Sequence, residues 1–459
     1  MERPSFSDSV LADYINKTKL SAKIFQKAWE HLPAGVSSSG RFYKPHPVIC
    51  NRGKGSKVWD VDGNEYIDYL LSYGALILGH LDSDVVAAIA SQLKKSLAIG
   101  TLTEVEIELA DLIAQTVPCA ESVRLCNSGT EASMYALRAA RAFTGKSKIA
   151  KFEGGFHGNH DYALVSVYPL EEMIGPENEP RSVAVGAGIP EAVISTVVTL
   201  PYNNWNACKP IIERNASELA AVVVEPLLGF GGGIPAEKEF LTELRRTTSE
   251  NGIPLIYDEV ITGFRLALGG AQEYFGVVPD MVILGKIIGG GFGMGAYAGK
   301  KNIMDTVAPT KNLKQDTTLK AFQSGTFNGH PVAAAAGLAT LKKLRDRKDE
   351  IYSRLNSFGQ KMRGQIRQEA QRLGIDMHVT GLGSIFNFHF TKEEPRSYRS
   401  ALKGDMGKLY NFYLALIANG LLVPPYTHAM ISAAHTEEDV ERTIAICGQV
   451  LKKLKQLES

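Results

Sequence analysis

The sequence has few cysteines, and their arrangement argues against two common kinds of stabilisation. The 459 residues include five cysteines, which are far apart, odd in number and form no Cys-x-x-Cys pair: Cys50, Cys119, Cys126, Cys208 and Cys447. Disulfide frameworks and zinc sites normally show paired cysteines at short spacing. We therefore expect no metal and no disulfide network, and we expect a reducing compartment, the cytoplasm.

An excess of charge of one sign is also absent. The 50 lysines and arginines nearly balance the 49 aspartates and glutamates, which leaves a net charge of +1. Proteins that bind nucleic acid usually carry a basic excess, so no nucleic acid partner is expected.

Long apolar segments are missing as well. The sequence contains no run of about 18 apolar residues, which a membrane-spanning helix would need. Its first residues, "MERPSFSDSVLADYINK", are too charged for the apolar core of a signal peptide. We therefore expect no contact with a membrane.

The patterns that are present predict an α/β protein with more than one domain, because 459 residues exceed the size of one ordinary core. Residues 76–336 alternate short apolar strands with helical stretches, which is typical of a mainly parallel sheet with helices on both faces. The predicted strands are "SVRLCN", "KIAKFE", "AAVVVEP", "PLIYDEV" and "DMVILGK".

Two segments flank this region. Residues 1–75 predict an amphipathic helix over Ser7–Leu32, with Leu20, Ile24, Ala28 and Leu32 on one stripe, and a hairpin of Val58–Asp60 with Tyr66–Asp68. Residues 337–459 predict a smaller α+β domain that starts with a helix, carries a strand at "AMISAAH" and ends with another helix.

The end of the first predicted strand offers a place for a phosphate. The strand stops at Asn127, and Ser128, Gly129 and Thr130 open a helix. The free N–H groups of a helix N-terminus bind anions, glycine permits close approach, and threonine adds a hydroxyl. The alternative is an ordinary helix cap made by the serine or threonine.

Two charged residues end later apolar strands. Asp258 follows "PLIY", where it is a helix cap, a buried ion-pair partner or a functional acid. Lys286 follows "MVILG" and precedes a run of glycines. A surface lysine could extend into water here, but the glycines empty the space that its amine would enter. A desolvated lysine has a lowered pKa and is a nucleophile.

Taken together, the three strand ends predict a pyridoxal 5'-phosphate (PLP) site. An enzyme that uses this cofactor needs a lysine that forms a Schiff base, an acid on the pyridine nitrogen and a place for the phosphate. Lys286, Asp258 and the Ser128–Thr130 segment supply these three elements.

Longer segments strengthen this interpretation by a resemblance to a known family. They are "NSGTEA" (127–132), "FEGGFHG" (152–158), "VVVEP" (222–226), "YDEVITGFR" (257–265), "GVVPDMVILGKIIGGG" (276–291), "SGTFNGHP" (324–331) and "AAHTEEDVERTI" (433–444). The sequence resembles the class III aminotransferases, which are PLP enzymes of fold type I, and among them the glutamate-1-semialdehyde 2,1-aminomutase group. The similarity covers residues 25–452.

The resemblance implies a fold and a set of roles. The expected fold is a large domain with a mainly parallel seven-stranded sheet, plus a small α+β domain formed by both chain ends. Lys286 would hold the cofactor and move protons, Asp258 would pair with the ring nitrogen, and Ser128, Gly129 and Thr130 would hold the phosphate. Four further residues complete the implied site: Val260 and Phe156 on the two faces of the ring, His157 close to it, and Thr326, which would reach the phosphate of the neighbouring subunit in a homodimer.

The expected reaction is transfer of an amino group from a small amino donor to an oxo acceptor. The loop "GVSSSGRFYKPHP" resembles the family loop that places a serine and an arginine near the substrate, and Ser38 and Arg41 match them. Arg41 would clamp a substrate carboxylate, unless it is an ordinary surface residue. The aminomutase group differs in having a Gly-Ser-Gly gating loop and an acidic residue where this sequence has Thr427 or His428, which favours transfer between molecules. Glutamate-1-semialdehyde aminomutase activity is the first alternative. Racemisation or decarboxylation with the same cofactor is a weaker one.

Two other classes of protein are weaker hypotheses. The stretch "GFGMGA" over residues 291–296 satisfies the G-x-G-x-x-A pattern of dinucleotide-binding proteins, although no strand directly precedes it. The second of these classes is a binding protein without catalytic activity. It requires that Lys286 or Asp258 be dispensable.

Overall fold

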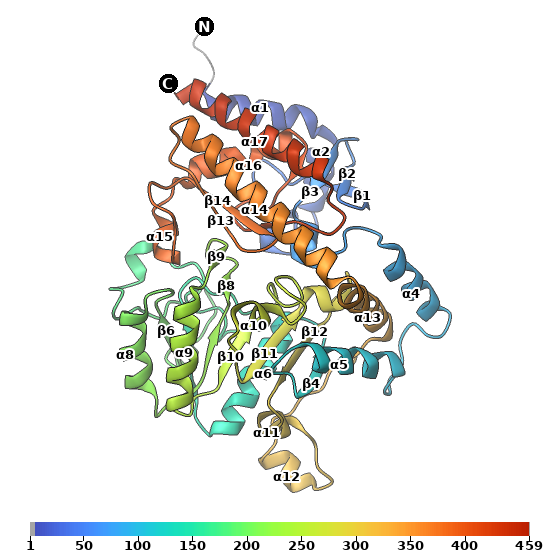
Figure 1. The fold of residues 1–459 in the computed structure, drawn as a ribbon, viewed down its shortest axis with the longest axis vertical. Coiled ribbons are helices and arrows are strands. Elements are labelled where there is room, and N and C mark those ends of the chain that lie inside the picture. The colour runs from blue at the N-terminus through green and yellow to red at the C-terminus, as the bar shows by residue number, and fades with distance from the viewer. Residues whose placement is uncertain (1–4, 459) are drawn as a thin grey trace.

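The larger part of the molecule is built on one central sheet. The computed structural model describes residues 5–458 (Figure 1). Seven strands form the sheet in the order β4-β12-β11-β10-β7-β5-β6. Their bounds are Ser122–Cys126, Gly295–Gly299, Met281–Gly285, Leu255–Asp258, Leu219–Val224, Lys148–Phe152 and Val197–Leu200, in that order.

Strand directions agree with the prediction of a mainly parallel sheet. β12 runs antiparallel to β4 and β11, and the remaining neighbours pair in parallel. The central strands β7, β10 and β11 are buried throughout, as expected for strands covered on both faces. β6 and β12 were not among the predicted strands, and β12 is rich in glycine and alanine, which are depleted in strands.

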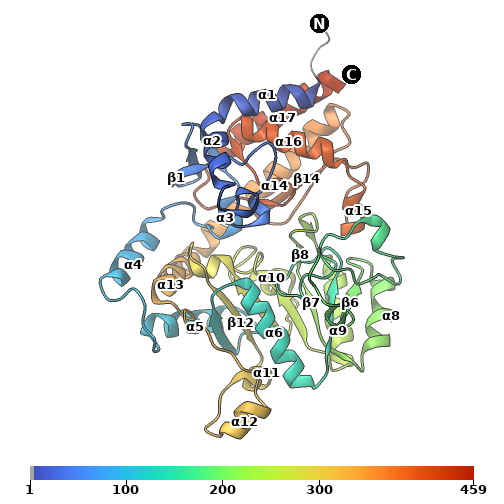
Figure 2. The same ribbon diagram turned by 180° about the vertical axis from the view of Figure 1, so that it is seen from behind.

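Helices cover both faces of this sheet. α6 (Gly129–Thr144) packs against β7, β11 and β12, and it faces the viewer in Figure 2. α5 (Glu104–Thr116) and α9 (Lys238–Glu250) pack against β4 and β10 on the other face (Figure 1). The remaining elements are α4 (Ser83–Leu93), η3 (Glu171–Met173), α7 (Glu191–Ile194), α8 (Trp205–Asn215), β8 (Leu227–Leu228), β9 (Ile234–Pro235), α10 (Gly270–Phe275), η4 (Lys286–Gly289), α11 (Lys301–Met304), η5 (Asp305–Val307) and α12 (Leu313–Thr318).

Both ends of the chain meet in the smaller part. A sheet of order β1-β2-β3-β15 joins the predicted hairpin to a strand near the C-terminus, with β15 parallel to β3. Helix α1 lies beside α16 and α17 (Figures 1 and 2). The elements are α1 (Phe6–Lys17), α2 (Lys19–Ala28), η1 (Pro33–Gly35), η2 (Ser39–Arg41), β1 (Cys50–Lys54), β2 (Lys57–Asp60), β3 (Glu65–Asp68), α3 (Leu71–Gly74), α14 (Lys348–Arg372), β13 (His378–Thr380), β14 (Ile385–His389), α15 (Tyr398–Leu402), α16 (Met406–Ala418), β15 (Leu421–Leu422), β16 (Ala429–Met430) and α17 (Glu437–Glu458).

The predicted helix over Ser7–Leu32 is wrong in two respects. It breaks at Thr18, whose backbone leaves the helical region and whose hydroxyl donates to the Tyr14 carbonyl. Its predicted apolar stripe is not a core face, because Leu20 and Ile24 are exposed and the buried residues of α2 are Ser21 and Phe25. The predicted strand at "AMISAAH" is also shorter than expected, since β16 holds two residues.

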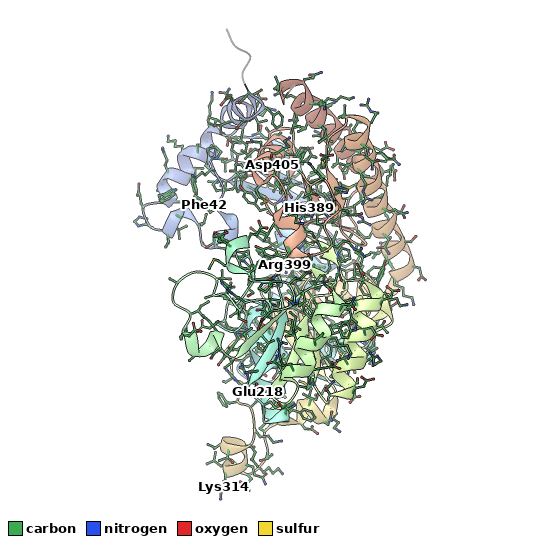
Figure 3. The ribbon with its side chains drawn as sticks, turned by 90° about the vertical axis from the view of Figure 1, so that its left-hand side faces the viewer. Phe42, Glu218, Lys314, His389, Arg399 and Asp405 are labelled. Carbon is green, nitrogen blue, oxygen red and sulfur yellow. The ribbon has the colours of Figure 1, made fainter. Side chains whose placement is uncertain are left out.

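The two parts are joined by α13 (Pro331–Asp346), which packs against α4, α5 and η4. The proposed division of the chain at residues 336 and 337 therefore falls inside a helix, and the division into three segments stays a proposal. A second junction involves Arg399 of α15, which lies where the two parts meet (Figure 3). Its Nε donates to Glu153 Oε2 at 2.7 Å. Within residues 5–458, no helix is both long and apolar enough to cross a membrane.

Candidate active site

A cavity of about 210 Å³ lies beyond the carboxyl ends of the central strands. Polar ligands in sheets of this type gather at that edge. Eight of the residues predicted from the sequence line it: Ser128, Gly129, Thr130, Phe156, His157, Asp258, Val260 and Lys286. Seven further residues complete the lining: Tyr73, Gly158, Glu225, Phe230, Ile261, Thr427 and His428.

Lys286 enters this cavity from the end of β11. It adopts a left-handed backbone conformation with φ 49°, which turns the chain sharply after the buried strand. Burial lowers the pKa of the Lys286 amine to about 8, although the negative charges of Asp258 and Glu225 oppose the shift. The lysine therefore does not extend to the outer surface, and its amine is a base near neutral pH.

Asp258 ends β10 and pairs with His157 inside the protein. Its Oδ2 lies 2.8 Å from His157 Nδ1, and its Oδ1 accepts from the backbone N–H of Val260 at 3.1 Å. Both side chains are almost completely buried, and burial lowers the pKa of the histidine. Asp258 is thus a buried partner of His157 that also lines the cavity, and its role as a functional acid stays a prediction.

The N-terminus of α6 opens onto the same cavity. The Ser128 Oγ accepts from the Glu131 N–H at 3.1 Å, so the serine caps the helix. The N–H groups of Gly129 and Thr130 belong to the first turn, where no helical carbonyl can accept from them. The Thr130 hydroxyl accepts from the Asn159 N–H at 3.2 Å. Two free amides and two hydroxyls at a helix N-terminus form a suitable place for a phosphate.

The available space supports this assignment. A Cβ added to Gly129 would lie 3.0 Å from Val260 Cγ2, and a Cβ added to Gly158 would lie 2.7 Å from Thr130 Cα. Glycine at both positions therefore lets the backbone approach the space beside the helix terminus. Amide donors, a buried carboxylate and an amine line one cavity between Val260 and Phe156, and these residues fit PLP.

Glu225 was missed as a site residue, although the segment "VVVEP" was recognised. It follows the apolar strand β7 as Asp258 ends β10, so the same pattern could have indicated it. Its Oε1 accepts from the Phe156 N–H at 2.7 Å, and its Oε2 accepts from the Gly229 N–H at 3.1 Å. Burial raises its pKa to about 8, and the charge of Asp258 adds to the shift.

Three predicted residues do not line the cavity in the described chain. Ser38 and Arg41 are exposed on and beside η2. Tyr73, which lines the cavity, donates its hydroxyl to the Gly40 carbonyl at 2.6 Å. The loop therefore reaches the edge of the cavity through Tyr73. Thr326 is exposed, in a segment that also exposes Phe327. Its role at a neighbouring subunit stays a prediction.

The dinucleotide hypothesis does not fit the structure. The glycines of residues 291–296 follow η4 and lead into β12, whereas a dinucleotide fingerprint follows a strand and opens a helix.

Comparison with known proteins identifies the class. The sequence profile of the family described as "Aminotransferase class-III" matches residues 39–436. The chain therefore belongs to the class III aminotransferase family, and its cofactor is PLP.

Individual relatives are similar over nearly their whole length. The glutamate-1-semialdehyde 2,1-aminomutase of Methanothermobacter thermautotrophicus is 44% identical over 437 residues, which cover 95% of this chain and 99% of the relative. An omega-transaminase from Sphaerobacter thermophilus superposes with a TM-score of 0.86 at 36% identity, covering 95% of this chain and 97% of the other. A beta-phenylalanine aminotransferase from Variovorax paradoxus gives 0.84 at 31% identity, covering 96% and 97%.

The glycine beside the phosphate cradle gives a first prediction. We expect Gly158→Ala to raise the Kd for PLP by at least about tenfold, because its φ of 103° is strained for alanine at a cost of about 1–3 kcal/mol and its Cβ would press on Thr130. Fluorescence titration of the cofactor-free protein with PLP measures this. Gly145→Ala at the other end of α6 is the control, since its φ is 68° and nothing lies within 4 Å of its Cβ. Equal Kd values for the two variants would contradict the proposed cradle.

Proposed function

We propose that this protein moves the amino group of a small carboxylate-bearing substrate, with Lys286 as the group that holds PLP and transfers protons. The observation that carries the proposal is the convergence of Lys286, Asp258 and the N-terminus of α6 on one cavity. Ser128, Gly129 and Thr130 would bind the phosphate, Asp258 would pair with the ring nitrogen, and Val260 and Phe156 would contact the two faces of the ring. The buried His157 would orient Asp258 through the 2.8 Å contact.

The chain's own groups account for the proton movements. When bound, PLP supplies a conjugated ring that takes up the electron pair left on the substrate carbon. Lys286 Nζ, whose lowered pKa of about 8 makes its neutral form far more abundant than that of an ordinary lysine, accepts the proton from that carbon and returns it at a neighbouring position. Asp258 would place its carboxyl group beside the ring nitrogen. Phe156, Phe230 and Ile261 contribute apolar surface to the cavity.

The amino group can move within one molecule or between two. We propose the intramolecular reaction first, because the full-length relative at 44% identity is a glutamate-1-semialdehyde 2,1-aminomutase. This choice reverses the preference that the sequence suggested, and the comparisons support the former alternative better. Transfer between molecules is the second candidate. It is favoured by the cavity wall at Thr427 and His428, which carries no carboxylate, and by the similarity to two transaminases.

One experiment separates the two reactions. The purified protein loaded with PLP is incubated with glutamate-1-semialdehyde and no other oxo compound, and mass spectrometry follows 5-aminolevulinate. We expect conversion of the substrate to this isomer. A parallel panel pairs amino acid donors with pyruvate or 2-oxoglutarate, and the product is the new amino acid.

The outcomes have distinct meanings. Isomerisation without an added acceptor supports the aminomutase proposal. Turnover only when donor and acceptor are both present supports the second candidate and overturns the first. Loss of carbon dioxide or change of configuration without amino transfer would overturn both.

A further inference from the structure

A buried lysine and a buried glutamate hold opposite ends of one peptide group beside the cavity. Lys151 Nζ donates to the Gly155 carbonyl at 2.9 Å, and Glu225 Oε1 accepts from the Phe156 N–H at 2.7 Å. The carbonyl of residue 155 and the N–H of residue 156 belong to the same peptide group. Neither Lys151 nor Glu225 was predicted as a site residue, and Lys151 does not line the cavity.

Strand pairing explains why these two side chains meet there. Lys151 on β5 pairs with Val223 on the parallel strand β7, and Glu225 lies two residues further along the chain. Glu225 directly follows β7, which ends at Val224, so the glutamate reaches the 155–156 peptide group from the end of the strand beside β5.

Charge and burial favour this arrangement. The N–H end of a peptide dipole is positive and the carbonyl end is negative, so the glutamate and the lysine each face the end that attracts them. Lys151 is completely buried, and burial lowers its pKa to about 7. Of the two acids near Lys151, Glu153 is paired with Arg399, and Glu225 contacts the other end of the peptide group.

Glu225 also reaches the second aromatic side chain of the cavity. Its Oε2 accepts from the N–H of Gly229, the residue before Phe230, at 3.1 Å. The rings of Phe156 and Phe230 are 4.6 Å apart with a 39° angle between their planes. One carboxylate therefore binds the backbone next to both rings.

We propose that Lys151 and Glu225 are positioning residues that clamp the 155–156 peptide group and thereby fix the Phe156 ring against the cofactor. The clamp itself is independent of the reaction, whereas its link to the cofactor rests on the proposed function of Phe156. The two claims can therefore be tested by separate measurements.

Hydrogen–deuterium exchange of the full-length protein tests the clamp. Mass spectrometry follows the peptide that covers residues 153–158, with and without PLP. Above pH 8, where the Glu225 carboxyl is ionised, we expect Glu225→Gln to speed exchange at the Phe156 amide by about tenfold, because a neutral amide accepts a hydrogen bond less strongly than a carboxylate. Lys151→Met acts on the other end of the same peptide group, so the double variant is expected to show less than the product of the two single effects.

The matched control is Glu259→Gln. Glu259 is another fully buried glutamate, which accepts from the Ala271 N–H and from Gln272 and does not line the cavity. We expect this variant to lose thermal stability without a change of exchange at residues 153–158. If one clamp variant does not fold, the other carries the measurement. Unchanged exchange in a folded clamp variant would overturn the proposal.

Visible circular dichroism of bound PLP tests the link to the cofactor, because this signal depends on how the ring is held. We expect Glu225→Gln to change the signal by at least about twofold, as does Phe156→Ala, while Glu259→Gln leaves it unchanged. If the clamp variants alter exchange and Phe156→Ala leaves the signal unchanged, the clamp stands and the proposed place of Phe156 is wrong.

Discussion

Replacement of Lys286 by alanine is expected to lower kcat by at least about 10⁴-fold, since a positioned general base alone contributes about 10²–10⁴-fold and the covalent attachment of PLP is lost as well. The Lys286→Ala variant should still bind PLP through the amides and hydroxyls of the α6 N-terminus. Single-turnover kinetics with substrate and PLP, together with borohydride reduction followed by peptide mapping, measure both effects. Reduction should label Lys286 in the unmodified protein and no residue in the variant.

Two further variants sharpen this test. Lys286→Arg should be as inactive as the alanine variant, because arginine stays protonated and cannot accept a proton. Lys300→Ala removes a lysine that is half exposed and pairs with Asp280, and it should leave kcat unchanged. Because burial lowers the pKa of Lys286 to about 8, the neutral base becomes more abundant as the pH rises through that value. We therefore expect the rate of the free enzyme to rise toward pH 8 and then level. Substantial turnover by Lys286→Ala would refute the proposed chemistry.

Replacement of Asp258 by asparagine is expected to lower kcat by about 10²- to 10³-fold, the effect seen when one preorganised electrostatic partner is removed. Asparagine has nearly the same shape and can still accept from the Val260 N–H, so the loss reports the missing charge together with the altered contact to His157. The visible absorbance of bound PLP against pH gives a second readout, because the proposed partner of Asp258 is the ring nitrogen.

Asp280→Asn is the matched control for this variant. Asp280 is also mostly buried and pairs with Arg245 and Lys300, but it lies at the opposite end of β11 from Lys286. Its replacement should lower the melting temperature without the loss of kcat. Equal losses of kcat in the two variants would mean that Asp258 acts only through stability.

The site residues at strand ends could be predicted from the sequence because a charged residue directly after an apolar strand is a local sequence pattern. Lys286 and Asp258 each follow an uninterrupted apolar strand, and parallel strands bring such ends to one edge of a sheet. The same rule applies to Glu225, which shows that the pattern was general and was applied too narrowly. Residues that enter the cavity from the smaller part, such as Tyr73 and His428, come from loops far away in the sequence. No local sequence pattern predicts that these residues line the cavity.

Other differences have equally physical causes. β12 escaped prediction because its sequence "GAYAG" has little β propensity, and the strand forms because β4 and β11 hold it on both sides. The helix expected over Ser7–Leu32 breaks at Thr18, whose backbone leaves the helical region and whose carbonyl and hydroxyl both contact the His46 side chain. Periodicity described the amphipathic character of this segment and could not show which side of α2 faces the core.

The contact between Arg399 and Glu153 connects the smaller part to the segment that leads into the cavity wall at Phe156. Next to it, the Tyr398 hydroxyl donates to the Pro169 carbonyl at 2.8 Å, and a Cβ on Gly154 would lie only 2.6 Å from the Tyr398 side chain. α15 thus packs directly against Gly154, two residues before Phe156. A rigid-body rotation of the smaller part would either break these contacts or move Phe156 together with α15. In the second case, access for substrate and the shape of the cavity would change in a single motion.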